Sequence, residues 1–276
     1  MNTKKTLYIS DLDGTLLNRN AEISPYTEEY LNRMFADGLY FSVATARTSA
    51  TASMILGGVQ WRVPLLLLNG VLMYDIAQKQ YTQVITLSGT TVRTIVSMMK
   101  DLNMTGLMYQ LINDEQVTYY ETLKHKPLYD FIEERKIRYK KVFHKVSFTD
   151  VSPENTIYFT FLDVYEKIQL AYKAFSVISD ICLSIYRDIY STDLWYLEIH
   201  SDKASKQNGT IHLRKTYGFE RIIGFGDNLN DLPLFAACDL RVAVDNAVAE
   251  VKAAADYICD SNDNDGVVKW IRENAH

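Results

Sequence analysis

Short runs of apolar residues alternate with amphipathic stretches at both ends of the chain. Such continuous apolar runs are typical of strands buried on both faces of a parallel sheet, and the stretches between them have the period of helices. The pattern therefore predicts an α/β fold with a doubly wound parallel sheet. The predicted strands cover 6–10, 39–45, 65–70, 221–227, 240–244 and 256–259, with helices at 25–38, from about 232, and through 251.

The middle of the chain has a different pattern, rich in Tyr, Thr and Ile in alternating segments. The segments KVSFTD, NTIYFTF and LWYLEIH predict strands with one polar face, and VYEKIQLAYKAF predicts a helix. This composition is typical of an α+β module with a mixed or antiparallel sheet and helices on one face. We therefore expect a discontinuous core, residues 1–83 and 199–276, into which residues 84–198 are inserted as a second domain.

The first predicted strand ends in an acidic string, DLDGT. Asp11 and Asp13 are two carboxylates two residues apart, and they would repel each other unless cations or hydrogen bonds compensate them. A purely structural alternative is a strand-to-turn junction in which Asp caps and Gly14 bends the chain.

A second acidic string, GDNLND, follows the predicted strand at 221–227. It contains Asp227, Asn230 and Asp231 at a helix start, where an ordinary N-cap is the alternative interpretation. Parallel strands that end at the same sheet edge would bring these acids beside Asp11 and Asp13. Oxygen-rich clusters suit Mg²⁺, so the two strings together predict a magnesium site.

Four strings, DLDGT, ATAR, the region of Lys206 and GDNLND, occur in the order of the four motifs of haloacid dehalogenase-like phosphatases, which the chain resembles. The dipeptide Asn69–Gly70 and the strings VAVDNAVAEVKAAADY and SNDNDGV are similar to the Cof-type branch of sugar-phosphate phosphatases. The middle segment matches the large cap domain of that branch in length and position only. The resemblance implies a phosphatase acting on a small phosphorylated metabolite, with a sugar phosphate as the first expectation.

The resemblance also implies roles for the acids. Asp11 would be the nucleophile that forms an aspartyl-phosphate, and Asp13 would protonate the leaving oxygen and then activate water. Mg²⁺ would be held by Asp11, the main-chain carbonyl of Asp13 and Asp227, and Asp231 would orient that shell. The metal would neutralise phosphoryl charge so that one anion can attack another.

Further residues would bind phosphate or substrate. Thr45 would bind phosphoryl oxygens and Arg47 could reach substrate, although Ala46 stands where the family has Gly. A helix N-cap remains the alternative for Thr45.

Lys206 is preferred over Lys203 as the charge-neutralising lysine, with a surface lysine as the alternative for either. Asn69 reads locally as a hairpin turn, but after a buried leucine run it is expected at the catalytic edge, where Asn230 also belongs.

Three further stretches resemble known binding motifs only in part. GFGDNL lacks the third glycine of a dinucleotide loop. DSNDNDG resembles a calcium loop but has Asp265 where glycine belongs and Ile271 where the bidentate glutamate belongs, so we expect a loop and helix cap. The basic stretch at 135–145 is interpreted first as a solvated cap face, second as a site for an anionic substrate or partner, and distantly as a nucleic-acid contact.

The composition of the chain argues against several classes of partner and cofactor. A net charge of -5 does not favour a nucleic-acid binder, and no apolar stretch is long enough for a signal peptide or a membrane span. Three scattered cysteines support neither a disulfide framework nor a zinc site, so a cytoplasmic protein is expected. Several tyrosines of the middle segment could stack on a sugar or fill a core: Tyr109, Tyr119, Tyr120, Tyr158, Tyr186 and Tyr196.

Two alternative functions stay open. A phosphoryl-transfer mutase on the same fold would return the phosphoryl group to a sugar, and phosphate release without a bisphosphate activator would distinguish the hydrolase. A non-catalytic sugar-phosphate-binding protein would bind tightly without turnover, and it would not need the pair Asp11 and Asp13.

Overall fold

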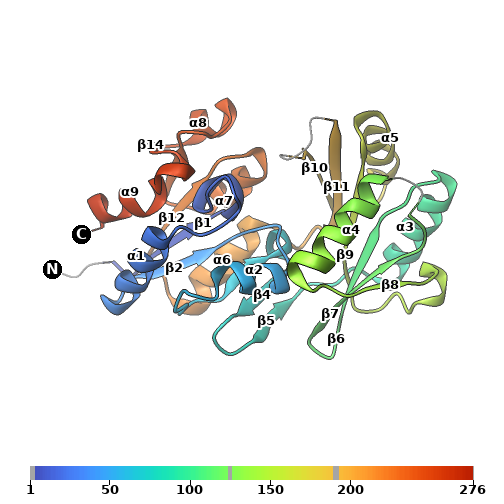
Figure 1. The fold of residues 1–276 in the computed structure, drawn as a ribbon, viewed down its shortest axis with the longest axis horizontal. Coiled ribbons are helices and arrows are strands. Elements are labelled where there is room, and N and C mark those ends of the chain that lie inside the picture. The colour runs from blue at the N-terminus through green and yellow to red at the C-terminus, as the bar shows by residue number, and fades with distance from the viewer. Residues whose placement is uncertain (1–3, 124–125, 189–192, 276) are drawn as a thin grey trace. The chain divides into compact units, whose positions relative to one another are not determined.

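The computed structural model describes residues 4–123, 126–188 and 193–275. They form two compact units, Met1–Gln83 with Ser205–His276, and Val84–Ala204 (Figure 1). The second boundary lies six residues beyond the predicted 198/199, because β11 (Leu194–Ser201) still pairs with β10 (Ile181–Arg187) at Ser201. The predicted α/β fold class, a parallel sheet with an inserted α+β domain, is confirmed.

The first unit is built on a five-stranded sheet of order β14-β13-β12-β1-β2. Every neighbouring pair in it is parallel, and the central strand β12 pairs with β1 from the other end of the chain. The strands are β1 (Thr6–Ser10), β2 (Tyr40–Val43), β12 (Arg221–Gly226), β13 (Leu240–Val244) and β14 (Tyr257–Cys259). Their carboxyl ends therefore share one edge, as the sequence predicted.

Helices cover both faces of this sheet. Leu7 and Ile9 of β1 pack with Leu213 of α6 and Leu234 of α7 on one face, and Phe225 of β12 contacts Trp270 of α9 on the other. The helices of this unit are α1 (Pro25–Ala36), α2 (Ser49–Leu56), α6 (Lys206–Tyr217), α7 (Leu232–Ala236), α8 (Ala249–Ala254) and α9 (Gly266–Asn274).

The leucine run at 65–70 differs from the prediction. β3 (Leu65–Leu67) forms an antiparallel pair with β4 (Leu72–Asp75) in a separate three-stranded sheet that ends with β5 (Gln80–Val84). A parallel bridge between Ala44 and Leu66 joins β3 to the end of β2. A run of leucines is buried in a parallel sheet and in an antiparallel one. The apolar pattern alone therefore did not distinguish the two kinds of pairing.

The second unit has a six-stranded mixed sheet of order β10-β11-β9-β6-β7-β8. Besides β10 and β11, its strands are β6 (Leu107–Ile112), β7 (Glu115–Tyr120), β8 (Phe143–Lys145) and β9 (Thr156–Val164). Its helices are α3 (Gly89–Asp101), α4 (Lys126–Tyr139) and α5 (Tyr165–Phe175).

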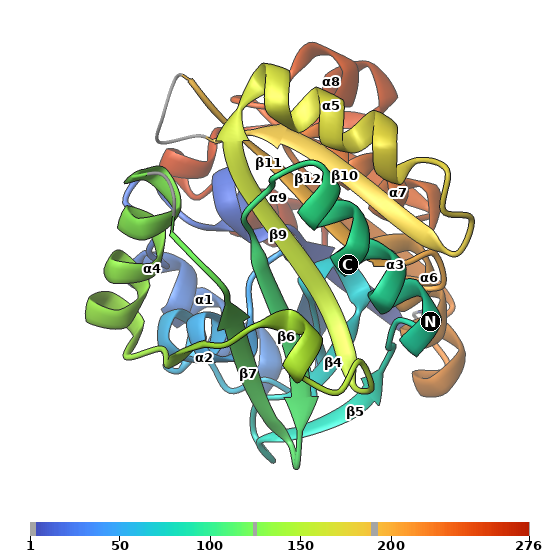
Figure 2. The same ribbon diagram turned by 90° about the vertical axis from the view of Figure 1, so that its right-hand side faces the viewer.

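Alternation along these strands gives the sheet two unlike faces. One face is apolar and packs against α3 and α5, through residues such as Phe159 and Leu197. The opposite face carries tyrosines, and α4 lies on that side, where Phe131 contacts Tyr196 (Figure 2). The helices are thus divided between the two faces, not gathered on one as the sequence predicted.

The segment KVSFTD was also predicted wrongly. β8 ends at Lys145, and Phe148–Asp150 forms a short 3-10 helix, η3, instead of a strand. Phe148 is buried in the apolar core of the second unit, which explains the apolar position without a strand. Within the described ranges, no helix combines the length and apolar character that a membrane span requires.

Candidate active site

The turn after β1 carries the first two acids. The backbone N–H of Asp11 donates to Phe225 O of β12 at 3.0 Å, which ties the two strand ends together. The chain then turns through η1 (Leu12–Leu16), where Gly14 has a positive φ of 78°. A Cβ at Gly14 would lie 2.5 Å from Oδ2 of Asp227, so only glycine allows the two acidic strings to approach so closely.

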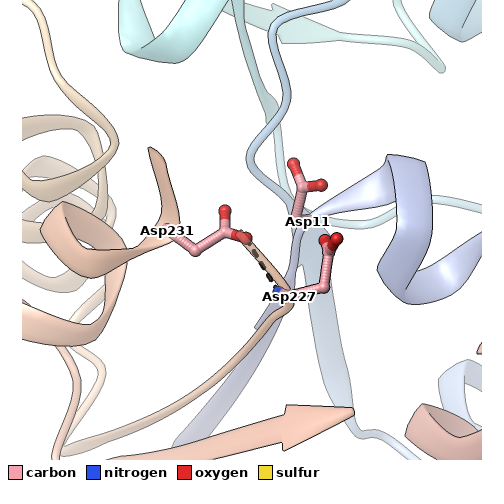
Figure 3. A group of neighbouring side chains, drawn as sticks. All are labelled: Asp11, Asp227 and Asp231. Carbon is pink, nitrogen blue, oxygen red and sulfur yellow. Dashed lines mark hydrogen bonds between the residues drawn. The ribbon is translucent and has the colours of Figure 1, made fainter. Parts of the chain in front are cut away.

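The acids of the second string, GDNLND, lie close to those of the first, DLDGT. Asp11, Asp227 and Asp231 each offer a carboxylate oxygen, and these atoms lie within 4.8 Å of one another (Figure 3). Asp231 is fully buried at the end of η4 (Leu229–Asp231), and its Oδ2 accepts the backbone N–H groups of Asp227 at 2.9 Å and Asn228 at 3.1 Å. The acids of the two strings are therefore brought together, as the parallel order predicted.

Lys206 supplies a cation to this cluster. Its Nζ donates to Oδ1 of Asp11 at 2.6 Å and to Oδ1 of Asp231 at 2.7 Å, and the residue is 2% exposed at the start of α6. Burial alone would lower the pKa of Lys206, but the two carboxylates outweigh it and raise this pKa above its ordinary value. Lys203 is exposed, and the structure brings Lys206, the preferred lysine, to the acids.

The single positive charge of Lys206 does not balance the negative charges of the three carboxylates. Burial raises the pKa of Asp11 well above its ordinary value, and the charges of Asp231 and Asp227 raise it further, against the opposing effect of Lys206. Burial and Asp231 likewise raise the pKa of Asp227 to about 7. Raised carboxyl pKa values mean that the site lacks positive charge. A divalent cation would provide it, and the oxygen-only donor set fits Mg²⁺.

Arg47 is paired with Asp13. Its Nε donates to Oδ2 of Asp13 at 2.7 Å and its NH2 donates to Oδ1 at 2.6 Å, a two-pronged ion pair that holds both carboxylate oxygens. The Arg47 side chain is 14% exposed and that of Asp13 is 32% exposed. The sequence predicted that Arg47 could reach substrate, and that stays a prediction; the structure adds the charge-assisted pair with Asp13.

The remaining predicted residues border the same edge. Thr45 is buried after β2, and its Oγ1 accepts the backbone N–H of Arg47 at 3.1 Å. The N-cap of α2 is Thr48, so the alternative reading of Thr45 as a cap is wrong.

Asn69 has a positive φ of 55° in η2 (Leu68–Gly70), at the turn between β3 and β4, and its backbone N–H donates to Thr45 O at 2.9 Å. It thus forms the hairpin turn and also lies beside the sheet edge. Asn230 lies in η4 and is half-buried.

Two contributors were not assigned from the sequence. Thr15 Oγ1 donates to Oδ1 of Asp227 at 2.7 Å, and Asn246 Nδ2 donates to Gly14 O at 2.7 Å. Both residues lie within the strings DLDGT and VAVDNAVAE, so their positions in these motifs could have indicated a role at the site. What was missing was the register that places β13 and its following turn against the Gly14 turn.

The calcium-like string serves the scaffold. Asn262 Nδ2 donates to Leu17 O at 2.8 Å, and Oδ1 of Asp265 accepts the hydroxyls of Ser24 and, at 2.9 Å, Thr27. Asp265 occupies the N-cap position of α9 without a side-chain cap bond. The predicted loop is confirmed, but its acid binds the start of α1 instead of capping α9.

Comparison with known proteins identifies this arrangement. The family model for haloacid dehalogenase-like hydrolases matches residues 8–271, nearly the whole chain. The chain belongs to this family. The resemblance drawn from the four sequence motifs is therefore confirmed, and the acid cluster lies where those motifs meet.

Individual relatives of this hydrolase cover its full length. It is 25% identical to the 5-amino-6-(5-phospho-D-ribitylamino)uracil phosphatase YitU of Bacillus subtilis, over 99% of this chain and 98% of the relative. It is 21% identical to the pyridoxal phosphate phosphatase YbhA of Escherichia coli, over 95% of each chain. A haloacid dehalogenase-like hydrolase from Bacteroides thetaiotaomicron has the same fold, with a TM-score of 0.80, 22% identity, and coverage of 98% of this chain and 99% of that one.

Proposed function

We propose that this hydrolase is a magnesium-dependent phosphatase that transfers the phosphoryl group of a small phosphorylated metabolite, a sugar phosphate in the first instance, to Asp11 and then to water. The observation that carries the proposal is the acid cluster, whose buried carboxylates outnumber the one lysine among them. Two full-length relatives are named as phosphatases of small phosphorylated molecules, which supports the same reaction class.

The cation fits the site chemically. Asp11, Asp227 and the main-chain carbonyl of Asp13 would hold Mg²⁺, with Asp231 ordering the turn beneath them through its bonds to Asp227 and Asn228. When bound, Mg²⁺ neutralises charge on the phosphoryl oxygens so that an anion can approach phosphorus. Thr15 orients Asp227 for this role by donating to its Oδ1.

Asp11 is the proposed nucleophile. Lys206 holds its Oδ1 at 2.6 Å, which fixes the carboxylate at the strand end and favours its ionised form against the neighbouring acids. In the first step a carboxylate oxygen bonds to phosphorus and the bond from phosphorus to the leaving oxygen breaks. In the second step water attacks the same phosphorus, the bond to Asp11 breaks, and inorganic phosphate leaves.

Asp13 is the proposed acid and base. It gives a proton to the leaving oxygen in the first step and takes one from water in the second. Arg47 holds both oxygens of Asp13, so a proton on Asp13 requires that one of these two hydrogen bonds opens. We assign Arg47 the positioning of Asp13, and we assign phosphate or substrate binding to Thr45, Asn69 and Asn230 at the same edge.

The second unit is proposed as the domain that selects the substrate. It has its own apolar core, and on its tyrosine-bearing sheet face Tyr186 and Tyr196 are only partly buried, so we assign contact with a leaving group to these two rings. Deletion of Val84–Ala204 should leave activity on nitrophenyl phosphate but erase the ranking among natural metabolites. An unchanged ranking would place selection in the first unit.

The decisive experiment measures phosphate release from nitrophenyl phosphate, sugar phosphates and pyridoxal phosphate, with Mg²⁺ and with excess chelator. Activity should require Mg²⁺ and should disappear in Asp11→Asn, because an amide is a poor nucleophile. Mass spectrometry of the quenched reaction should find one added phosphoryl group on the peptide that contains Asp11. Turnover by Asp11→Asn, or full activity in chelator, contradicts the mechanism.

A further inference from the structure

The basic stretch at 135–145 is not one uniform solvated face. Tyr139 and Phe143 are buried, and Lys141 between them is half-buried, whereas Lys140 and Lys145 are exposed. The Nζ of Lys141 lies 4.8 Å from the ring centre of Tyr109 and 5.5 Å from that of Phe143. One amine of the stretch is thus turned onto aromatic rings of the second unit.

Lys141 differs from the basic residues of α4 in its lack of a carboxylate. Each of those residues has an acidic partner within the helix, the pairs being Lys126 with Asp130, Arg135 with Glu134, Lys136 with Glu133 and Arg138 with Glu134. Across the described part of the chain, no carboxylate lies within ion-pair distance of Lys141. Aromatic faces attract an ammonium group but do not neutralise it.

The charged groups around Lys141 do not supply the missing anion. Arg135 of α4 is the neighbouring charge; it is positive, and it is paired with Glu134 at 2.9 Å, so that carboxylate is already engaged. Glu198 of β11 lies on the same sheet face, but it accepts the hydroxyl of Tyr158 at 2.6 Å. Burial, and then Arg135, lower the pKa of Lys141 to about 7, so the amine is only partly protonated near neutral pH.

We propose that Lys141 and Arg135, with the rings of Tyr109 and Phe143 as walls, form a binding site in the second unit for an oxyanion, a carboxylate or phosphate group of a small molecule. A bound oxyanion provides the charge that the amine lacks, and the rings provide apolar surface for the body of the molecule. The site does not depend on the phosphatase reaction. It lies wholly within the second unit, and no catalytic residue takes part in it.

Binding at such a site must take up a proton. An anion close to an amine typically raises its pKa by about 1–3 units, so the ligand draws Lys141 fully into the ammonium form. Affinity should then fall by roughly tenfold for each pH unit between the free and the bound pKa of Lys141. An anion held by exposed, fully charged lysines would show no such pH dependence in this range.

The test follows the amine itself. Reductive methylation with ¹³C-formaldehyde labels the lysines of the intact protein, and Lys141→Met identifies the signal of Lys141 in the NMR spectrum. This signal should titrate near pH 7. Its midpoint should rise by about one unit or more in at least one of formate, acetate, benzoate, sulfate or inorganic phosphate. Benzyl alcohol, which has the ring of benzoate without its charge, should leave the midpoint unchanged.

Lys140→Met is the matched control, because it removes an exposed charge one residue away. It should leave the anion response of Lys141 intact, and Arg135→Gln should weaken that response. If no anion in the panel moves the Lys141 midpoint, or if Lys140→Met abolishes the response, the proposal is wrong.

Two sources of the oxyanion remain to be separated by kinetics. If the group belongs to the substrate, the anion that moves Lys141 should inhibit turnover competitively, and this inhibition should weaken in Lys141→Met. If it belongs to a separate metabolite, the same anion should change kcat without competing with substrate. The NMR titration measures anion binding without turnover, so its result remains valid even if the protein proves not to be a phosphatase.

Discussion

Lys206 in the first unit and Lys141 in the second have amines with opposite surroundings. Lys206 in the first unit donates to two carboxylates at 2.6 and 2.7 Å, whereas Lys141 in the second unit lies over two rings without an acid partner in the described chain. The pKa of Lys206 is raised and that of Lys141 is lowered to about 7. The same side chain is thus a fixed cation in one unit and a titratable group in the other.

The comparison shows how local charge balance indicates what a site must bind. Around Lys206 the carboxylates are in excess, which calls for a further cation. Around Lys141 the neighbouring Arg135 is already paired with Glu134, so the amine is the group that lacks an anion. In both places burial is the first cause of the pKa shift, and a neighbouring like charge adds to it.

The largest effect is expected for Lys206→Met, which leaves Asp11 and Asp231 buried without their cation. Removing one partner of a buried ion pair typically costs about 3–5 kcal/mol of stability. Turnover should fall by at least roughly a hundredfold, because the nucleophile loses the group that orients it. The measurements are phosphate release and urea unfolding.

Lys203→Met is the control for this variant, since Lys203 is exposed three residues earlier. It should change neither quantity by much. If both variants behave alike, Lys206 is not the cation of the site and the contrast between the two lysines disappears.

A smaller effect is expected for Arg47→Lys, because a lysine cannot hold both oxygens of Asp13. We expect a loss in kcat of roughly tenfold to a hundredfold with little change in KM. Asp13→Asn alone should lose about a hundred- to ten-thousand-fold, more for a sugar phosphate than for nitrophenyl phosphate.

The double variant separates positioning from substrate binding. Once Asp13 is Asn, Arg47→Lys should cost almost nothing further, because its effect acts through Asp13. If the two losses simply multiply, Arg47 acts on the substrate and the positioning role is refuted.

A third effect links metal and pH. The pKa of Asp227 is raised to about 7 from an ordinary value of 3.8. A carboxyl group whose folded pKa is raised stabilises the fold below its unfolded pKa, and this contribution is lost as the pH rises through about 7. The metal-free protein should therefore lose stability between about pH 4 and pH 7.

Mg²⁺ should restore this stability, and its effect should grow with pH because it binds the ionised carboxylates. At a hundredfold excess over Kd we expect about 2.7 kcal/mol, or roughly 5–10 °C in Tm. Melting curves with and without Mg²⁺ at pH 5, 6, 7 and 8 provide the check, with Asp227→Asn as the variant in which the pH dependence should flatten. A Mg²⁺ shift that is independent of pH contradicts this account.

The smallest effect is expected for Lys141→Met, and its sign is opposite to that of Lys206→Met. Replacing a half-buried amine that has no acid partner by an apolar chain of similar length should be neutral or stabilising, by about 1 kcal/mol. A lowered folded pKa means that Lys141 destabilises the fold most at or below pH 7 and not at all above about pH 10. The gain measured by urea unfolding should therefore shrink as the pH rises, and a clear loss of stability at pH 7 would falsify the comparison.

Much of the first unit could be predicted from sequence because its strands are buried on both faces. β1 and β13 begin and end where the apolar runs at 6–10 and 240–244 do. The meeting of Asp11, Asp227 and Asp231 followed from parallel order alone. The antiparallel pairing of β3 with β4 did not, because three consecutive leucines fit either kind of sheet.

Long-range partners were the other limit. The local sequence did not predict that Arg47 would bind Asp13, because Arg47 lies in a short polar loop where its side chain could take many directions. The same holds for Lys141, which stands in a row of basic residues that look alike in sequence. Its contact with the ring of Tyr109 depends on β6, a strand some thirty residues earlier in the chain, beside which the end of α4 is placed only by the tertiary fold.

The pairing of β1 with β12 has a consequence for the order in which the protein is made. Asp11 leaves the ribosome early, but Lys206 follows 195 positions later, and the partner strand β12 later still. The second unit is one unbroken stretch of chain, so it is complete before either arrives, and domains of this kind generally fold as units during synthesis. A nascent chain can therefore carry a folded second unit while Asp11, the proposed nucleophile, still lacks Lys206 and its neighbouring strand. The enzyme cannot act on cellular phosphates until its last quarter has emerged.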